Sequence, residues 1–567
     1  MLGFIEMAGV GLVYSALTFL TFIRLWPHLQ THSITRNIWD FGPNLWLQWW
    51  GPYALSRAMN PFHTRWLFYP AGSELTVDAW PVQWLIEWPL RIFLNPVGRY
   101  NLLAAFSYFA TGLASYALFR LFTRSKSGAL LASFALTFSS YRNFSLVTSH
   151  SELLQTQWAV LMVLAYFVYQ RGPWPRKTNL WLLAAAAAAA YNELRTFMMA
   201  MMLIGVYSIF SAWLRHREAP EDAERFLWKW LTFCLGVAVI TAPLFIEDVR
   251  VLGLGRYRTA PHIATMSVGW RDALLPPAHH LLRVFDNNAL GSDMLEERGE
   301  GYVSVAVLGL AILGLIRLRD RAEERPLALA LAFFAVLEAT HRPLARLPFL
   351  SFLRVPARFS FVTALLAGIF ACQGWEYLSG RIRDVPSRFL LWAALSVMIV
   401  VETNPVLEPL TVVWNADETA LDALKKRGDG AVLDLPLTLE PPFSLIPPLS
   451  FAGRYNVEAF LRAVRHEKPL VNGNLSFPGM GDSGDRCDKD LQSLLLCQGR
   501  GSCGGLDGSF WSRLRQSEGI RYVISEKTAP ENPLLAAARR SGALSVVETD
   551  PEIDVYEIRA PLPGSDD

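Results

Sequence analysis

The sequence predicts a polytopic α-helical membrane protein that carries a small soluble α/β domain at its C-terminal end. Hydrophobic residues make up 52% of the 567 residues and charged residues only 18%, whereas a soluble domain has roughly 25% charged residues. Apolar runs of membrane-spanning length recur along the chain as far as about residue 401. After them, short β-rich segments alternate with helix-like segments. A mean hydropathy of +0.24 is modest for a chain that lies wholly in lipid, which agrees with a separate polar domain.

Eleven apolar stretches are candidates for membrane crossings. A bilayer core needs about 20 residues of helix, and runs of about 15 suffice when neighbouring helices or flanking anchors support them. The stretches run approximately over 7–26, 100–119, 128–141, 153–170, 180–191, 196–214, 230–246, 302–316, 326–337, 359–374 and 389–401. We therefore predict about 11 transmembrane helices within a domain of residues 1–403.

The short connecting loops predict the orientation, because Lys and Arg near span ends are retained in the cytoplasm. Every second loop is basic, as the groups 120–126, 171–177, 215–229, 317–325 and 381–388 show. A cytoplasmic N-terminus places all these loops inside and places residues 404–567 on the extracytoplasmic side. The first apolar run lacks a basic region before it and a small-residue cleavage site, so it is expected to remain as a span. We expect a bacterial inner membrane, with the C-terminal domain periplasmic or extracellular.

Charge and missing motifs exclude several function classes. The formal net charge is +2, which gives no basic field, so nucleic acid is not expected as a partner. The apolar cores contain no Asp, Glu, Lys or Arg except Arg24, although charged residues within spans usually mark ion or proton pathways. No P-loop, dinucleotide-binding glycine fingerprint or G-x-S-x-G motif is present, so a soluble nucleotide site is not predicted.

The first extracytoplasmic loop, residues 27–99, is far longer than most connections between helices, and such loops are usually functional. It contains Asp40 and then a Trp-rich segment, 43–59, that suits a helix lying in the membrane interface. A second Trp-rich segment, 81–94, is expected to do the same, with Asp78 shortly before it. Two such helices would form a platform beside which a lipid headgroup could be presented.

This arrangement resembles the GT-C superfamily of integral-membrane glycosyltransferases. The resemblance rests on an acidic residue soon after the first span, an interfacial helix, many spans and a C-terminal soluble domain. The segments YNLLAAFSYFATGLASYALFRLFT, ALTFSSYRNFSLVTSHSELLQTQW and SFLRVPARFSF resemble poorly characterised bacterial proteins of this kind, as do AVLDLPL, HEKPLVNGNLS and GIRYVIS in the tail. This resemblance covers nearly the whole chain.

The resemblance implies transfer of a sugar from a polyprenyl-phosphate donor to a hydroxyl of a glycan, lipid or protein acceptor, in contact with membrane lipids. Asp40 would be the catalytic base, because a positioned carboxylate can take the hydroxyl proton during attack on the anomeric carbon. Arg354 and Arg358 would receive the departing phosphate, with Arg195 the next candidate. The loop lacks the paired acidic motif of well-studied members, so no cofactor and no metal ligand is predicted, and use of a divalent metal stays an open alternative.

Each candidate also has an ordinary structural interpretation. Asp40 can simply cap the following helix, and Asp78 can be a structural partner rather than a substrate ligand. Arg354 and Arg358 can anchor a span to lipid headgroups. His150 and Glu152 begin a helix with a spacing that can point at a sugar, although most such groups are solvated helix starts.

The C-terminal segment predicts a small α/β domain, because β-rich runs at 431–437, 520–525, 544–548 and 553–558 alternate with helix-like segments at 417–427 and 533–541. Cys487, Cys497 and Cys503 fall in this domain, where an oxidising compartment would permit one disulfide. We expect the pair Cys487 and Cys497.

Two other functions remain open at this stage. A lipid-linked glycan transporter or flippase would need polar residues along a path through the spans, which the uncharged cores do not supply. A non-catalytic partner in glycan assembly would not need the Asp40 carboxylate. The sequence favours a membrane glycosyltransferase over both.

Overall fold

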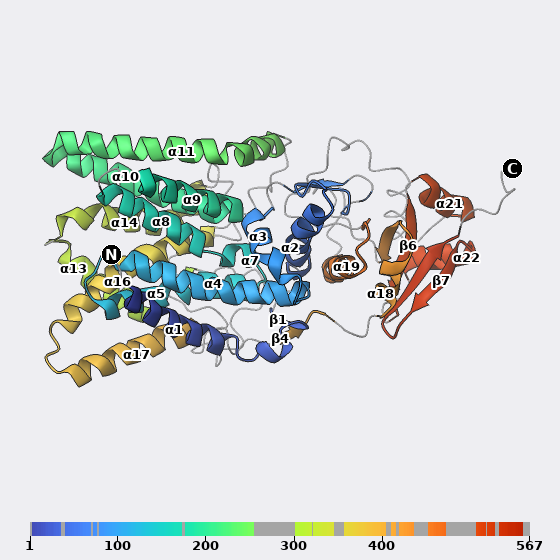
Figure 1. Ribbon diagram of the computed structural model, residues 1–567, viewed down its shortest axis with the longest axis horizontal. Coiled ribbons are helices and arrows are strands. Elements are labelled where there is room, and N and C mark those ends of the chain that lie inside the picture. The colour runs from blue at the N-terminus through green and yellow to red at the C-terminus, as the bar shows by residue number, and fades with distance from the viewer. Residues whose placement is uncertain are drawn as a thin grey trace. The chain divides into compact units, whose positions relative to one another are not determined.

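The computed structural model describes residues 3–35, 40–67, 69, 72–75, 79–172, 176–253, 301–319, 321–344, 356–403, 410–414, 419–435, 452–471, 506–517, 519–527 and 532–559. The chain divides into two compact units (Figure 1). The helical unit comprises Met1–Pro27 and Asn101–Leu410, and the loop-tail unit comprises His28–Tyr100 and Thr411–Asp567. The first long loop therefore folds together with the C-terminal segment. The division at residue 403, with the loop assigned to the membrane domain, stays a prediction.

The helical unit contains most of the described helices, both those that are apolar enough to cross a bilayer and shorter ones. They are α1 (Phe4–Thr21), α4 (Pro96–Phe119), α5 (Lys126–Thr137), α6 (Ser140–Val147), α7 (Ser151–Leu154), α8 (Gln157–Arg171), α9 (Arg176–Asn192), α10 (Leu194–Glu218), α11 (Pro220–Gly253), α13 (Val305–Ile316), α14 (Arg325–Leu344), α16 (Ser360–Ser379) and α17 (Val385–Thr403). α4 begins in the loop-tail unit and continues into the helical unit.

All the predicted apolar stretches fall on these helices. Among the described residues, 7 helices are long and apolar enough to span a membrane. The remaining stretches correspond to α5, α9, α13 and α14. The chain is a multi-pass membrane protein, and the number of 11 crossings stays a prediction.

α13 and α16 make a close helix contact without intervening side chains. A Cβ added to Gly374 would lie 1.8 Å from the Leu310 carbonyl oxygen, and one added to Gly314 would lie 2.0 Å from the Phe370 carbonyl oxygen. Small residues allow such backbone approach between membrane helices, where van der Waals packing holds helices together. These two glycines therefore set the distance between the helices.

The loop-tail unit contains the helices α2 (Phe41–Ser56), α3 (Pro81–Leu90), α18 (Thr419–Lys426), α19 (Ala452–His466), α21 (Gly508–Ser517) and α22 (Pro533–Arg540). Short strands pair β1 (His32–Ile34) with β4 (Leu410–Val412) and β2 (His63–Thr64) with β3 (Ser73–Glu74). A larger sheet comprises β5 (Ala431–Leu435), β6 (Ile520–Glu526), β7 (Leu544–Thr549) and β8 (Ile553–Ile558).

The larger sheet confirms the predicted C-terminal α/β domain. Its strand order is β5-β6-β8-β7, with β5 and β6 parallel and the other neighbours antiparallel. Residues of α18 pack on one face, and residues of α21 and α22 pack on the other (Figure 1). Because both faces are covered, β5 is buried along its whole length and β6 along most of it.

α2 differs from the helix expected in the membrane interface. It begins close to the predicted residue, but its residues from Phe41 to Ala54 are all buried within the protein. Its Trp side chains pack against α19 and against the chain around Leu67 and Trp80 rather than facing outward. The interfacial expectation was therefore wrong for α2, because Trp residues that suit a headgroup region also suit a protein core.

α3 keeps the amphipathic character that the sequence predicted. Leu85 and Trp88 on the helix, with Ile92 and Phe93 just after it, are exposed large apolar side chains. Gln83, Trp84 and Glu87 on the same helix are buried. Exposed apolar side chains of this kind suit contact with lipid, and the position of α3 in the membrane interface stays a prediction.

Candidate functional site

Three of the predicted site residues meet in the helical unit. Glu152 Oε1 lies 3.2 Å from His150 Nδ1 and 3.9 Å from Arg195 Nη1. Glu193 joins them, because its Oε1 lies 3.6 Å from Arg195 Nε. We call His150, Glu152, Glu193 and Arg195 the ionic cluster. The side chains of both carboxylates are 4% exposed, and those of Arg195 and His150 are 11% and 17% exposed.

A tight turn between α6 and α7 places the first half of the ionic cluster. Ser149 adopts a left-handed φ of 66°, and the His150 amide donates to the Ser145 carbonyl oxygen at 2.8 Å. This reverses the chain after α6, so that His150 stands immediately before α7 and Glu152 lies in its first turn. The sequence prediction that these residues begin a helix is confirmed.

The junction between α9 and α10 places the second half. Glu193 is the N-cap of α10, and its carboxylate accepts from the backbone amides of Arg195 and Thr196 at 3.0 and 2.5 Å. A carboxylate is favourable there because it satisfies amides that lack partners in the first turn and faces the positive end of the helix dipole. We did not select Glu193 from the sequence, although an acidic residue two positions before Arg195, at the start of a span, was the available signal.

The first half of the ionic cluster has buried polar atoms that no described residue satisfies. Glu152 Oε2 and Ser151 Oγ are buried and have no hydrogen-bond partner in the described structure. Buried polar atoms are almost always hydrogen-bonded to protein or to water. Nearby, the Gln155 side-chain amide donates to the Leu103 carbonyl oxygen at 3.1 Å, and Gln157 donates to Gln155 at 2.6 Å. A carboxylate oxygen that accepts from a sugar hydroxyl or a water fits this arrangement.

Asp40 belongs to the loop-tail unit, and the ionic cluster belongs to the helical unit. It occupies the N-cap position of α2 and is partly buried, yet its side chain makes no capping hydrogen bond. The next residue, Phe41, is fully buried and packs edge-on against Tyr100, with ring centroids 4.9 Å apart. The structure therefore gives no support to the interpretation of the Asp40 side chain as a helix cap. The packing of Phe41 holds the backbone directly after Asp40 in place.

The predicted arginines are placed only in part. Arg358 is buried at the end of the 3-10 turn Pro356–Phe359, directly before α16, and its Nε has no hydrogen-bond partner. Arg354 and Asp78 lie outside the described residues, as do Cys487, Cys497 and Cys503. The described cysteines, Cys234 and Cys372, are free thiols.

A second buried polar group lies in the loop-tail unit, and we did not predict it. Gln48 of α2, Gln83 and Glu87 of α3 and Arg99 near the start of α4 are each at most 3% exposed. Glu87 Oε2 lies 3.9 Å from Arg99 Nε, and both side-chain amides have atoms without partners. Burial raises the pKa of the Glu87 carboxyl to about 8, against the lowering effect of Arg99. The signal in the sequence was the polar pair Gln83 and Glu87, one helical turn apart in a Trp-rich helix.

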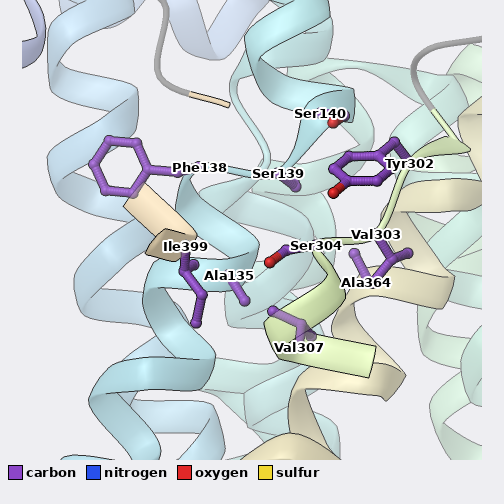
Figure 2. A pocket seen from close by; sticks show the side chains of 10 residues that line it. All are labelled: Ala135, Phe138, Ser139, Ser140, Tyr302, Val303, Ser304, Val307, Ala364 and Ile399. Carbon is purple, nitrogen blue, oxygen red and sulfur yellow. The ribbon is translucent and has the colours of Figure 1, made fainter. Parts of the chain in front are cut away.

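A small cavity in the helical unit has a hydroxyl-lined side (Figure 2). Ser139, Ser140 and Ser304 line it, and the Oγ atom of each is buried without a hydrogen-bond partner. Tyr302 also lines it and donates from its hydroxyl to Glu402. Its volume of about 20 Å³ leaves room for one or two ordered waters. The size of the cavity and its hydroxyl groups therefore suit ordered water rather than a sugar.

Among the described residues, no group of three or more His, Cys, Asp or Glu side chains is placed to hold a metal ion.

Comparisons with solved structures identify the fold. Arabinofuranosyltransferase AftD from mycobacteria, in a mutant form, aligns with a TM-score of 0.59 and 17% identity over 99% of this chain and 42% of that chain. ArnT from Cupriavidus metallidurans bound to undecaprenyl phosphate aligns with a TM-score of 0.51 and 10% identity, over 97% of this chain and 98% of the ArnT chain. The apo oligosaccharyltransferase of Archaeoglobus fulgidus aligns with a TM-score of 0.50 and 11% identity, over 92% of this chain and 69% of the oligosaccharyltransferase chain.

These alignments show that the chain has the GT-C fold of integral-membrane glycosyltransferases, as the sequence resemblance implied. The chain spans about 42% of the AftD chain but nearly all of ArnT. No family model matches the sequence, and no curated protein matches it.

Proposed function

We propose that this protein is a membrane glycosyltransferase that moves a sugar from a polyprenyl-phosphate donor to an extracytoplasmic acceptor hydroxyl. The observation that carries the proposal is the state of Asp40 within the GT-C fold. Its carboxylate stands at the start of a buried helix, shortly after the first span, without serving as that helix's cap. A carboxylate in this place is suited to act as a general base.

Asp40 would take the proton of the acceptor hydroxyl as the hydroxyl oxygen attacks the anomeric carbon. The bond from that carbon to the phosphate oxygen then breaks, and the electron pair leaves with the lipid phosphate. General-base assistance of this kind contributes typically about 10² to 10⁴-fold in rate. The donor's carrier lipid is proposed by analogy with the undecaprenyl phosphate bound to ArnT.

In the helical unit, the ionic cluster and Arg358 are charged groups of the kinds that bind sugars and phosphates. Arg358, whose Nε has no hydrogen-bond partner in the described structure, is suited to donate to a phosphate oxygen. In the ionic cluster, the two carboxylates partly neutralise Arg195, so this cluster is suited to hold sugar hydroxyls more than a phosphate. We therefore assign Glu152 and His150 to sugar binding and Arg358 to the phosphate. Arg354 keeps the phosphate role and Asp78 the substrate-binding role that the resemblance implies.

The proposed setting is a bacterial inner membrane, with the N-terminus in the cytoplasm and the sheet-containing tail outside. The support is the alternation of basic loops along the sequence and the apolar helices of the helical unit. Exposed Leu85, Trp88, Ile92 and Phe93 around α3 would contact the outer leaflet. The acceptor would be a glycan, a lipid or a protein on that side.

The test is sugar transfer by purified protein in detergent or nanodiscs, with synthetic polyprenyl-phosphate sugars as donors. Asp40→Asn keeps the size of the side chain and should lower kcat by at least about 100-fold, while folding and donor binding stay close to wild type. Asp429→Asn is the matched control, because Asp429 is an exposed carboxylate of the same unit.

Unchanged turnover in Asp40→Asn would remove Asp40 from the mechanism. Wild-type protein that transfers no sugar from any such donor, combined with Asp40→Asn that complements a gene deletion, would favour the non-catalytic assembly partner instead.

A further inference from the structure

The tail of the chain is bound tightly to the helix that follows Asp40. α19 packs along α2, and Phe460, which is fully buried, meets the Trp46 ring edge-on with centroids 6.4 Å apart. Trp46 in turn stacks on Trp50, with centroids 5.3 Å apart and an interplanar angle of 7°. Stacked and edge-on aromatic pairs add to the free energy that burial alone provides.

The first turn of α2 is held by a separate contact with the tail. Phe41 and Leu45 share a buried cluster with Val413, and Trp414 and Leu461 pack against it. Val413 and Trp414 both donate from their backbone amides to the Thr31 carbonyl oxygen, at 2.9 and 3.1 Å. The residue directly after Asp40 is therefore anchored by side chains that lie more than 370 positions later in the sequence.

Backbone hydrogen bonds continue this attachment into the sheet. The Leu470 amide donates to the Trp66 carbonyl oxygen at 3.0 Å, and the Tyr69 amide donates to the Leu470 carbonyl oxygen at 3.1 Å. On its other side, the same segment exchanges bonds with Val432 of β5, because the Val471 amide donates to Val432 at 2.9 Å. The loop, the segment 468–471 and β5 thus form one hydrogen-bonded layer.

We propose that the C-terminal tail is the positioning element for Asp40, acting through the contacts of Phe460 with α2 and of Leu461 with the Phe41 cluster. This inference rests on the proposed function of Asp40. α2 has no free face on which to re-form an equivalent contact, since its residues from Phe41 to Ala54 are buried. A shift of α2 therefore moves the backbone that carries Asp40, and a displacement of about 1 Å at a reacting group can cost about 100-fold in rate.

Phe460→Ala tests the proposal, with Phe510→Ala as the matched control. Both remove a buried phenylalanine from the same unit, but Phe510 lies on α21 in the cluster that covers the sheet, and that cluster contains no residue of α2. We expect Phe460→Ala to lower kcat about 10- to 100-fold with KM for the donor within about threefold of wild type. Phe510→Ala at matched folded fraction should keep kcat, and Phe460→Leu should restore most of it.

Hydrogen exchange of the full-length protein provides a readout that does not depend on activity. Exchange at residues 41–47 should become faster in Phe460→Ala and stay at the wild-type rate in Phe510→Ala. Equal losses of kcat in the two variants, or unchanged exchange at 41–47 in Phe460→Ala, would overturn the positioning role. If wild-type protein shows no sugar transfer, the proposed function fails, while the exchange result still decides whether the tail holds α2.

Discussion

Replacing Glu87 by Gln is expected to change how stability depends on pH. Glu87 is 1% exposed, and its nearest charged neighbour is Arg99, whose Nε lies 3.9 Å from the carboxylate. The charges of Arg99 and Arg91 lower the pKa of Glu87, but burial dominates and raises it from 4.5 to about 8. The folded protein therefore holds a proton on Glu87 at pH values at which the unfolded chain has released it.

The sign follows from that difference in bound protons. Between about pH 4.5 and about pH 8, the folded state binds one more proton at this site than the unfolded state, so stability falls as the pH rises through this range. At about 1.4 kcal/mol per pH unit, the full effect approaches about 5 kcal/mol. Gln has nearly the same shape and does not titrate, so Glu87→Gln should lack this loss.

Thermal unfolding of both proteins in detergent at pH 5, 7 and 9 measures the effect. The two melting temperatures should lie close together at pH 5, and Glu87→Gln should become increasingly the more stable protein toward pH 9. Glu552→Gln serves as the control, because Glu552 is an exposed carboxylate in the same unit. A Glu87→Gln protein that is less stable than wild type at pH 9 would refute this reasoning, because it would show an ionised Glu87 stabilised by Arg99.

The remaining predictions concern the helical unit. Gly374→Ala should lower the free energy of unfolding by at least about 1 to 3 kcal/mol, because the added Cβ would lie 1.8 Å from the Leu310 carbonyl oxygen. Gly205→Ala is the control, because a Cβ added there meets no atom within 4 Å, and it should leave the melting temperature unchanged or raise it. Equal changes in melting temperature for Gly374→Ala and Gly205→Ala would contradict the close contact between α13 and α16. Glu193→Ala should cost about 1 kcal/mol through loss of the α10 cap, seen as a lower melting temperature than that of the exposed-site control Glu221→Ala.

Much of the fold was predictable from local sequence. Apolar runs predicted where the membrane helices lie. So many consecutive apolar side chains need lipid or other apolar helices around them, and in lipid the backbone must satisfy its own hydrogen bonds as a helix. The β-rich runs of the tail predicted β5 to β8 for a similar reason, since both faces of that sheet are covered. Helix starts were visible at Asp40 and at His150, where polar residues precede apolar segments.

The candidate site was predictable only in its components. His150 and Glu152 are neighbours in sequence, but their approach to Arg195 depends on how α7 and α10 pack. Glu193 and the Glu87 group were missed because a charged residue near a span end looks the same whether it faces water or a buried partner. Trp residues in α2 were misassigned to the membrane interface for the same reason, since pattern alone does not say which apolar surroundings cover a ring.

The sequence alone determined the class of this protein: its membrane helices, its α/β tail and the acidic residue after the first span. The tertiary structure decided that the first loop folds with the tail, through contacts such as the ion pair between Arg57 and Glu467, which are 410 positions apart. Local patterns record what surroundings a side chain needs, such as an apolar contact or an opposite charge. They do not record which distant segment provides them, because many segments of the chain could satisfy the same need.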